Sequence, residues 1–350
     1  MKIKIITACI AVISLLSIHS KLFADHSVLV AKPDSHAPLG VMGDHMHKDG
    51  EYMVSYRYMN MDMEGLLNGS SSVTTSEALT YSRGDGTTYR IIPASMTMEM
   101  HMLGMMYGLS DDITIMAMTN YIEKDMDHTT YNMMGTAKVG TFSASTSGFG
   151  DSSASAMIKM SSIFRSHITL GFSLPTGSVK EEVTALMPNG TNKVVRAPYG
   201  MQLGSGTYDA ILGYTISDNS SELGWGAQIK YKKPLNKNNG WRFGTKFEAT
   251  AWVSLPINDN ISSAIRFIVI DEDHIDGNDT SITGRNPTQE PSNYGGKSYF
   301  ASISINLLGQ ENSLKGHRLS IDFIKPLEQD LNGLQMKKDS SIIIGYQKAW

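Results

Sequence analysis

Apolar side chains recur at every second position in many separate segments of this 350-residue chain, and this period constrains the fold more than any other feature. In residues 241–253, WRFGTKFEATAWV, Phe247 and Val253 share one face, while Lys246 and Glu248 lie on the other. A helix with 3.6 residues per turn cannot separate these two sets, whereas a β-strand does. The segment is therefore predicted to be a strand with one apolar face and one polar face.

The same alternation marks about twelve predicted strands along the chain, and their connections alternate between long and short. The segments lie near residues 50–64, 95–108, 112–122, 152–161, 165–175, 201–216, 222–234, 241–256, 260–271, 297–309, 315–326 and 340–350. Barrels of the bacterial outer membrane have an even number of antiparallel strands, short periplasmic turns and long external loops. The predicted fold class is all-β, a transmembrane antiparallel β-barrel of about 12 strands with both termini in the periplasm.

The last segment, SIIIGYQKAW at 341–350, places Ile344, Tyr346 and Trp350 on one face and ends on an aromatic residue. This resembles the C-terminal signal of outer-membrane barrel proteins, although Lys348 stands where an apolar residue is more usual. The barrel-assembly machinery, outer-membrane lipid and lipopolysaccharide are therefore expected partners. A soluble exported β-sandwich would also show the alternation, but the aromatic end and the rhythm of the loops favour the barrel.

The first 24 residues have the features of a secretory signal peptide. Two lysines precede an apolar stretch at 5–18, which is shorter than the roughly 20 residues that a spanning helix needs. Ala24 is the expected last residue before cleavage, and Cys9 is the only cysteine, so the mature chain has no disulfide. The predicted organisation is a signal peptide over 1–24, a periplasmic N-terminal segment over 25–49 that acts as a plug or as a metal-binding stretch, and the barrel over 50–350.

The charge of the chain narrows its function. A formal net charge of -4 gives no indication of nucleic-acid binding. An exported barrel without long apolar helices is expected in the cell outer membrane of a Gram-negative bacterium, where it passes a small solute as a channel or transporter. A barrel enzyme would need a nucleophile, a base and an orienting group close together. No motif supplies them, so the chain is not expected to be an enzyme.

Charged side chains on the polar faces predict the lining of the barrel interior. In MTMEMHM at 96–102, Glu99 and His101 alternate with methionines. A charge that faces lipid at the middle of the bilayer costs about 2–4 kcal/mol, so the two polar side chains are expected inside and the methionines outside. The predicted lumen-lining residues are Arg57, Glu99, His101, Lys230, Arg242, Lys246, Glu248, Arg266 and Asp322.

Methionine is concentrated in one part of the chain: 17 of the 23 methionines lie between Met42 and Met134. One interpretation is a hydrophobic passage that adapts to varied ligands. The alternative is copper binding or transport, since thioethers and imidazoles are ligands for copper. The stretch GDHMHKDG at 43–50 favours the alternative. The candidate metal ligands are Asp44, His45, Met46, His47, Met59, Met61 and Met63, with His26 and His36 as further candidates. Copper is the only cofactor considered.

Four long stretches together resemble one family. They are HAPLGVMGDHMHKDGEYMVSYRYM at 36–59, MTMEMHMLGMMYGLSDDITIMAM at 96–118, PYGMQLGSGTYD at 198–209 and LKGHRLSIDFIKPLEQDLNGLQM at 314–336. They are similar to outer-membrane β-barrel transporters related to the meta-pathway phenol-degradation proteins. The resemblance covers residues 36–350 and implies an outer-membrane β-barrel that passes a small molecule. It implies no substrate and no functional residues.

Overall fold

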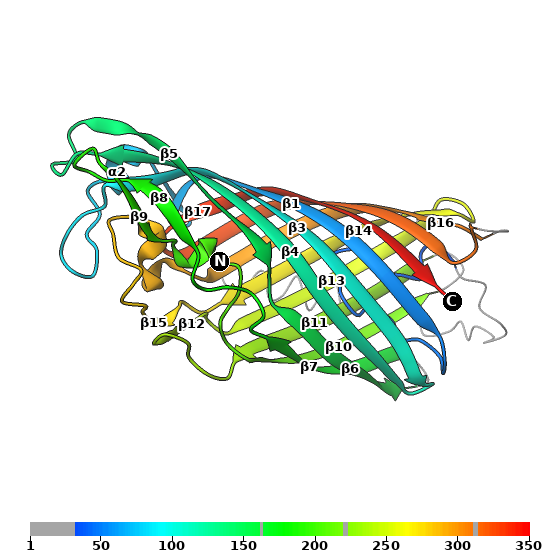
Figure 1. Cartoon of the computed structure of the whole chain (residues 1–350). Helices are drawn as coiled ribbons and strands as arrows, with labels where there is room; N and C mark the ends of the chain where they lie inside the picture. The colour runs from blue at the N-terminus through cyan, green and yellow to red at the C-terminus, as the bar shows by residue number, and fades with distance from the viewer. Residues whose placement is uncertain (1–31, 162–163, 220–222, 311–313) are drawn as a thin grey trace, which may run out of the picture. The chain divides into compact units, whose positions relative to one another are not determined.

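Eleven strand elements close one antiparallel barrel in the computed structural model, which describes residues 32–161, 164–219, 223–310 and 314–350 (Figure 1). In ring order they are β1 (Tyr52–Gly69), β3 (Ile91–Ser110), β4 (Ile113–Tyr131), β6 (Ser152–Ser161), β7 (Arg165–Leu174), β10 (Asp209–Asn219), β11 (Gly224–Pro234), β13 (Lys246–Pro256), β14 (Ile261–Glu272), β16 (Gly296–Leu308) and β17 (His317–Ala349). Neighbours in sequence pair with one another, and β17 pairs with β1. The ring therefore has no free edge.

The element β17 passes through the barrel wall twice and so supplies two of the barrel strands. Its first arm, residues 318–331, pairs with β16, and its second arm, 331–349, pairs with β1. The chain reverses beside Gly333, which has a φ of 63°, and the amide of Gln329 bonds the backbone of Lys338 across the turn. A closed ring in which every neighbouring pair is antiparallel needs an even number of strands. The two arms of β17 and the other ten strand elements make twelve barrel strands, which confirms the predicted fold class.

The outer face of the barrel is an apolar band. Along the start of β1, exposed and buried side chains alternate strictly, with Tyr52, Val54 and Tyr56 outside. The exposed large apolar side chains of the other strands follow the same rule and include Leu103, Ile115, Leu170, Leu212, Ile229, Val253, Ile265, Ile303, Ile321 and Ile344. Polar side chains occupy most of the alternate, buried positions, whereas methionines occupy several of those on β1 and β3. This inversion of the soluble pattern is that of a barrel surrounded by lipid.

One side of the barrel extends well beyond a bilayer. β1, β3 and β4 have 18, 20 and 19 residues, whereas a tilted transmembrane strand needs about 9–11. Residues 113–118 of β4 pair with β6. Residues 121–131 pair with β5 (Lys138–Phe149), which lies off the ring. Strand structure therefore replaces the long external loop expected over 123–151.

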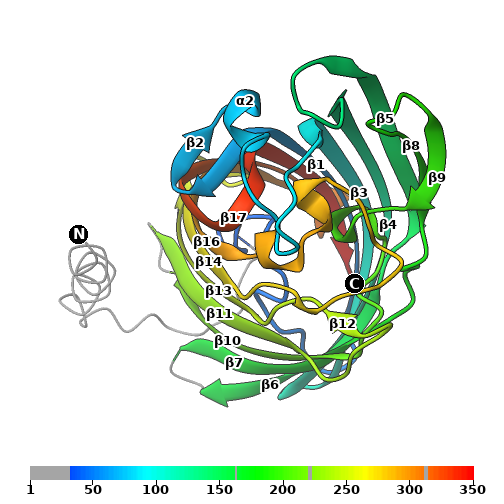
Figure 2. The same ribbon diagram turned by 90° about the vertical axis from the view of Figure 1, so that its left-hand side faces the viewer.

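The remaining short elements gather at the external end of the barrel (Figure 2). They are β2 (Ser71–Val73), α2 (Thr75–Ala78), the hairpin β8 (Glu182–Leu186) and β9 (Asn192–Arg196), η2 (Tyr199–Met201), the pair β12 (Trp241–Arg242) and β15 (Asp276–Gly277), η3 (Pro287–Gln289) and η4 (Pro291–Asn293). None of the helices in the described ranges is both long and apolar enough to cross a membrane.

Three predicted strand starts were wrong. The strand expected from residue 340 is the second arm of β17, which pairs with β1 from residue 331, so the connection expected over 327–339 is mostly strand. The strand expected from residue 201 begins at Asp209, and the strand expected from residue 241 begins at Lys246. In both cases the first apolar residue of the expected strand packs in the external loops, where Met201 and Trp241 are fully buried in two clusters. An apolar residue at strand spacing does not distinguish a lipid-facing position from a loop core.

Candidate functional site

Residues 33–48, called the plug segment below, run through the interior of the barrel near its periplasmic end (Figure 2, dark blue). The segment has turns but no helix or strand. Its side chains Ala37, Leu39 and Val41 are almost fully buried, and Ala37 and Val41 pack against Trp252 of β13. The predicted signal peptide and the start of the predicted N-terminal segment lie outside the described residues, so the division at residue 24 stays a prediction.

Side chains of the barrel wall hydrogen-bond the backbone of the plug segment. Ser262 donates to the carbonyl of Pro33 (2.8 Å), Arg318 to Ala37 (2.8 Å), Gln228 to Met42 (3.0 Å) and His167 to Gly43 (2.9 Å), while Asp322 accepts from the N–H of Gly40 (3.2 Å) and Thr114 from that of His47 (2.9 Å). These six partners come from five strand elements. A buried backbone without regular structure requires such partners, and here the whole circumference of the barrel supplies them.

A buried ion pair holds the middle of the plug segment. Arg266 of β14 and Asp322 of β17 lie 3.4 Å apart and are 3% and 0% exposed. Ser304 donates a second hydrogen bond to Asp322, at 2.8 Å. A Cβ atom added to Gly40 would clash with the Arg266 guanidinium, so a larger residue at this point of the segment would have to displace that side chain.

A histidine cluster lies within the plug segment and joins its beginning to its end. It consists of His36, Asp44, His45 and His47. The rings of His36 and His45 are 4.3 Å apart, and those of His45 and His47 are 4.9 Å apart. Asp44 approaches His45 Nδ1 at 2.8 Å and His36 Nδ1 at 3.7 Å. The plug segment therefore folds back on itself around a carboxylate.

Burial sets the protonation of this histidine cluster. It lowers the pKa of His36 to about 3 and the pKa of His47 to about 4. Burial alone would raise the pKa of Asp44, but the neighbouring His45 and His36 hold it well below its usual range. At neutral pH two imidazoles are therefore uncharged, and the carboxylate between the rings is ionised.

The candidate methionine ligands do not join this histidine cluster. Met46 packs with Met53, Met106, Met116 and Met157 in an apolar group under the plug segment. Met59, Met61 and Met63 lie farther along β1, and Met63 reaches the external half of the barrel. Because a strand rises about 3.3 Å per residue, the spacing that looks compact in sequence spreads these ligands along the barrel.

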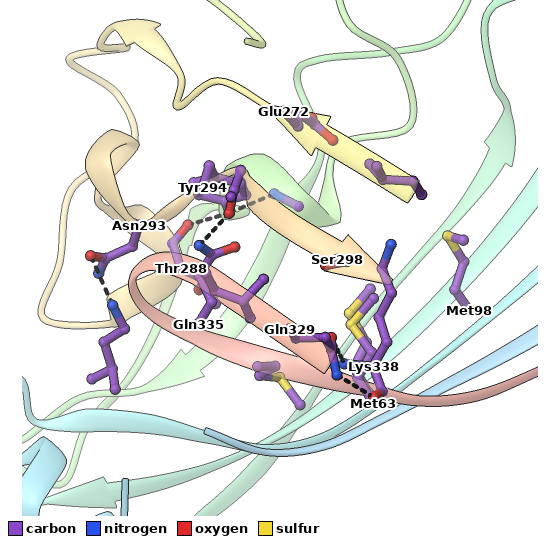
Figure 3. A pocket seen from close by; sticks show the side chains of 18 of the residues that line it. Met63, Met98, Glu272, Thr288, Asn293, Tyr294, Ser298, Gln329, Gln335 and Lys338 are labelled. Atoms are coloured by element: carbon purple, nitrogen blue, oxygen red, sulfur yellow. Dashed lines mark hydrogen bonds between the residues drawn. The ribbon is translucent and has the colours of Figure 1, made fainter. Parts of the chain in front are cut away.

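The external half of the barrel encloses a cavity of about 230 Å³, called the methionine cavity below (Figure 3). Its apolar lining comes from Met63, Met96, Met98, Met126, Ile270, Leu331, Leu334 and Met336. Its polar lining includes Glu272, Thr288, Ser298, Gln329, Gln335 and Lys338. Thioether side chains from β1, β3 and β4 thus face a small number of polar groups from β14, β16 and β17.

A roof of external loops borders the methionine cavity. The hydroxyl of Tyr294 donates to the carbonyl of Thr288 (2.7 Å) and accepts from the N–H of Gly200 (2.9 Å), which ties η3 and η4 to η2. Burial raises the pKa of Tyr294, so this hydroxyl keeps its proton. No local pattern predicts this roof, because the contact between Gly200 and Tyr294 joins residues 94 positions apart.

Six of the predicted lumen-lining residues lie inside the barrel: Arg57, Lys230, Lys246, Glu248, Arg266 and Asp322. Lys230 stands directly opposite Glu248 in the pairing of β11 with β13. Charges of both signs therefore line the interior, beside the plug segment and along the wall.

Three predicted lumen-lining residues lie elsewhere. Arg242 belongs to the external pair β12–β15 and binds Asp276 at 2.9 Å. The facing of β3 is the reverse of the expectation: Met96 and Met106 are buried inside, while Glu99 and His101 are on the outer face, where Tyr56 bonds His101 at 2.7 Å. The cost of a lipid-facing charge applies at the middle of the bilayer. β3 has 20 residues, about twice the length that a bilayer needs, so an outward carboxylate on it does not have to lie at that depth.

Comparisons with known proteins identify the architecture. No sequence profile of a known protein family matches the chain, and no curated protein matches it. Among solved structures, the chain is similar to an outer-membrane channel from Pseudomonas putida F1, with a TM-score of 0.56 and 11% identity over 88% of this chain and 98% of that one. The toluene transporter TodX of P. putida gives a TM-score of 0.42 and 9% identity over 87% and 91%. A FadL homologue of Pseudomonas aeruginosa gives 0.41 and 6% over 86% and 89%. The first likeness shows the fold, that of an outer-membrane β-barrel.

Proposed function

We propose that this protein is an outer-membrane conduit for small, mainly apolar solutes, with the plug segment as its periplasmic closure. The methionine cavity is the observation that carries the proposal. Unbranched thioether side chains fill irregular space and adapt to ligands of different shape. A solute that enters from the external end would bind there before it meets the polar interior and the plug segment.

The volume of the methionine cavity limits the solute. A cavity of roughly 150 Å³ lined by aliphatic side chains holds benzene, so about 230 Å³ has room for one ring with a small substituent. The few polar groups, among them Gln329 and Lys338, would orient a hydroxyl or carbonyl group on that ring. The solved channels named above, one described as a toluene transporter, are consistent with this class. The resemblance to phenol-degradation proteins is also consistent with it.

Copper transport is the weaker candidate. It requires the histidine cluster and the inward methionines of β1 to form one path. Met59 and Met61 are separated from the histidine cluster along the strand, and Met63 belongs to the methionine cavity. The methionines therefore favour an apolar passage, and the histidine cluster is treated separately below.

Filling the methionine cavity should weaken solute binding. In Met98→Trp, an indole would occupy the space beside Met96 and Met126. We expect toluene or phenol to bind at least about tenfold more weakly, a change equivalent to about 1.4 kcal/mol. Equilibrium binding of radiolabelled solute to the purified, folded barrel measures this effect.

Met105→Trp is the matched control for this experiment. Met105 lies on the same strand with the opposite facing and is 55% exposed on the outer surface. It should bind solute as the unmodified protein does. Equal binding in all three proteins would rule out the methionine cavity as the solute site.

The orientation of the barrel is tested by labelling in cells. The single native cysteine is Cys9, so new cysteines report their own position. Met134 lies in the connection between β4 and β5, and Asp259 lies in the short turn between β13 and β14. We expect a polyethylene-glycol maleimide to label Met134→Cys on intact cells, and Asp259→Cys only after the outer membrane is disrupted. The reverse pattern would contradict periplasmic termini.

A further inference from the structure

We propose that His36, Asp44 and His45 form a binding site for one divalent transition-metal ion, with Zn²⁺ and Cu²⁺ as the fitting ions. The site lies inside the plug segment and differs from the main set expected from sequence, because it excludes the methionines and His47 and includes His36, which was only a further candidate there. It does not depend on the solute that the barrel passes, so either proposal can fail while the other holds.

The spacing of the three side chains suits a metal ion. One ligand atom from each residue lies within 4.8 Å of the others. The closest pairs are His45 Nδ1 and Asp44 Oδ1 at 2.8 Å, and His36 Nδ1 and Asp44 Oδ2 at 3.7 Å. Two ligands bound at about 2.1 Å in a tetrahedral site are about 3.4 Å apart. Small side-chain rotations are enough to reach that separation.

Ring nitrogens without hydrogen-bond partners indicate a missing ligand. His36 Nδ1, His45 Nε2 and His47 Nε2 are buried and have no partner among the described residues. Buried polar atoms are nearly always hydrogen-bonded, and here three exceptions fall within one cluster. An ion held by His36 Nδ1 and His45 Nδ1 would satisfy the first of them directly, and His47, whose ring contacts that of His45, is placed to approach through Nε2 as a fourth ligand.

The surrounding charges determine which ions fit. Asp44 is the only carboxylate in the group, and Glu51 stands 3.7 Å from His47. The guanidinium groups of Arg57 and Arg318 also interact with Asp44 and oppose a cation. Hard cations such as Ca²⁺ or Mg²⁺ require several oxygen ligands, which this group lacks. Imidazole ligands favour Zn²⁺ and Cu²⁺.

The ion would act as a clip on the plug segment. It would join residue 36 to residues 44 and 45, and so close a short loop whose backbone is already bonded to the wall at Ala37, Gly40, Met42 and Gly43. Closing a loop reduces the conformational freedom of the chain that it contains. The metal-bound plug segment should therefore be more firmly seated than the metal-free one.

Zinc titration of the folded, purified protein tests the site. We expect one Zn²⁺ per chain by elemental analysis after dialysis. His36→Ala and His45→Ala should each weaken Zn²⁺ binding at least about 100-fold, an effect at the upper end of what loss of a metal-site partner produces. His101→Ala is the matched control, because that histidine is on the outer face of the barrel and should leave binding unchanged. Unheated gel migration confirms that each variant is folded.

A spectroscopic measurement on the unmodified protein removes dependence on the variants. With one equivalent of Cu²⁺, electron paramagnetic resonance should show hyperfine coupling to imidazole nitrogens. A spectrum with oxygen ligands only would overturn the proposal. So would a folded protein that retains no zinc, or zinc binding that is equal in His36→Ala, His45→Ala and the unmodified chain.

Discussion

Removal of the plug segment, residues 33–48, is expected to change the barrel from a closed state to one with steady ionic current. The segment occupies the periplasmic end of the interior, and wall side chains that surround it on all sides bond its backbone. Without it those side chains, among them Arg318, Asp322 and Gln228, would bind water instead. A wall lined by hydrated polar groups conducts ions. Planar-bilayer recordings of the refolded variant and the unmodified chain measure the difference.

A second variant separates the role of the plug segment from chain length. Replacing residues 33–48 by a glycine–serine sequence of equal length keeps the connection and removes the anchoring and apolar side chains. We expect intermittent current, because the replacement has no Leu39 or Val41 to pack inside the barrel. If neither variant conducts while both migrate as folded barrels, the seal lies in the external roof and our assignment of the plug segment is wrong.

The second large effect concerns stability. Asp322→Ala should lower the free energy of unfolding by about 3–5 kcal/mol, because it leaves the Arg266 guanidinium buried without its counter-ion. The carboxylate also accepts hydrogen bonds from Ser304 and from the N–H of Gly40, so the wall and the plug segment both lose a partner. Urea unfolding of the protein in lipid vesicles, followed by tryptophan fluorescence, gives the free energy.

The same chain offers a matched comparison. Asp339 pairs with Lys325 at 3.2 Å between the two arms of β17, and both side chains are about half exposed. Asp339→Ala should change the free energy of unfolding by only about 0–1 kcal/mol. The double variant Arg266→Met with Asp322→Leu should be close to the unmodified protein in stability, because it removes both buried charges. Equal losses of unfolding free energy in Asp322→Ala and Asp339→Ala would show that burial does not increase the contribution of the Arg266–Asp322 pair to stability.

The barrel was predictable because each strand has lipid on one face and polar groups on the other. Apolar and polar residues therefore alternate along the sequence of the strand. Strands such as β6, β14 and β16 were located within one residue at each end for this reason. β3 was predicted at the right place in the chain, but its inward and outward faces were assigned the wrong way round. Methionine fits both lipid and an apolar cavity, so the methionines did not distinguish the two faces. The 20-residue length of β3 shows that an outward Glu99 does not have to lie at the middle of the bilayer.

The candidate sites were less predictable. The histidines of the stretch 43–50 predicted a metal site, and the structure brings Asp44, His45 and His47 together there. His36 joins them only because the plug segment turns back inside the barrel, which no local pattern encodes. The methionine cavity combines β3 with residues near 290 and 335, and such long-range contacts leave no signal in one sequence.

The anchors of the plug segment have a consequence for biogenesis. Pro33, Ala37 and Gly40 bond residues that follow them by 229, 281 and 282 positions. The plug segment precedes every barrel strand in the chain, and it therefore completes its contacts last, after the final hairpin has joined β1. A nascent barrel would pass through a stage with an unfilled lumen, and such late, non-local contacts are slow to form. Leakage of the envelope during assembly is thus a risk that this architecture carries, and the speed of plug docking sets how long it lasts.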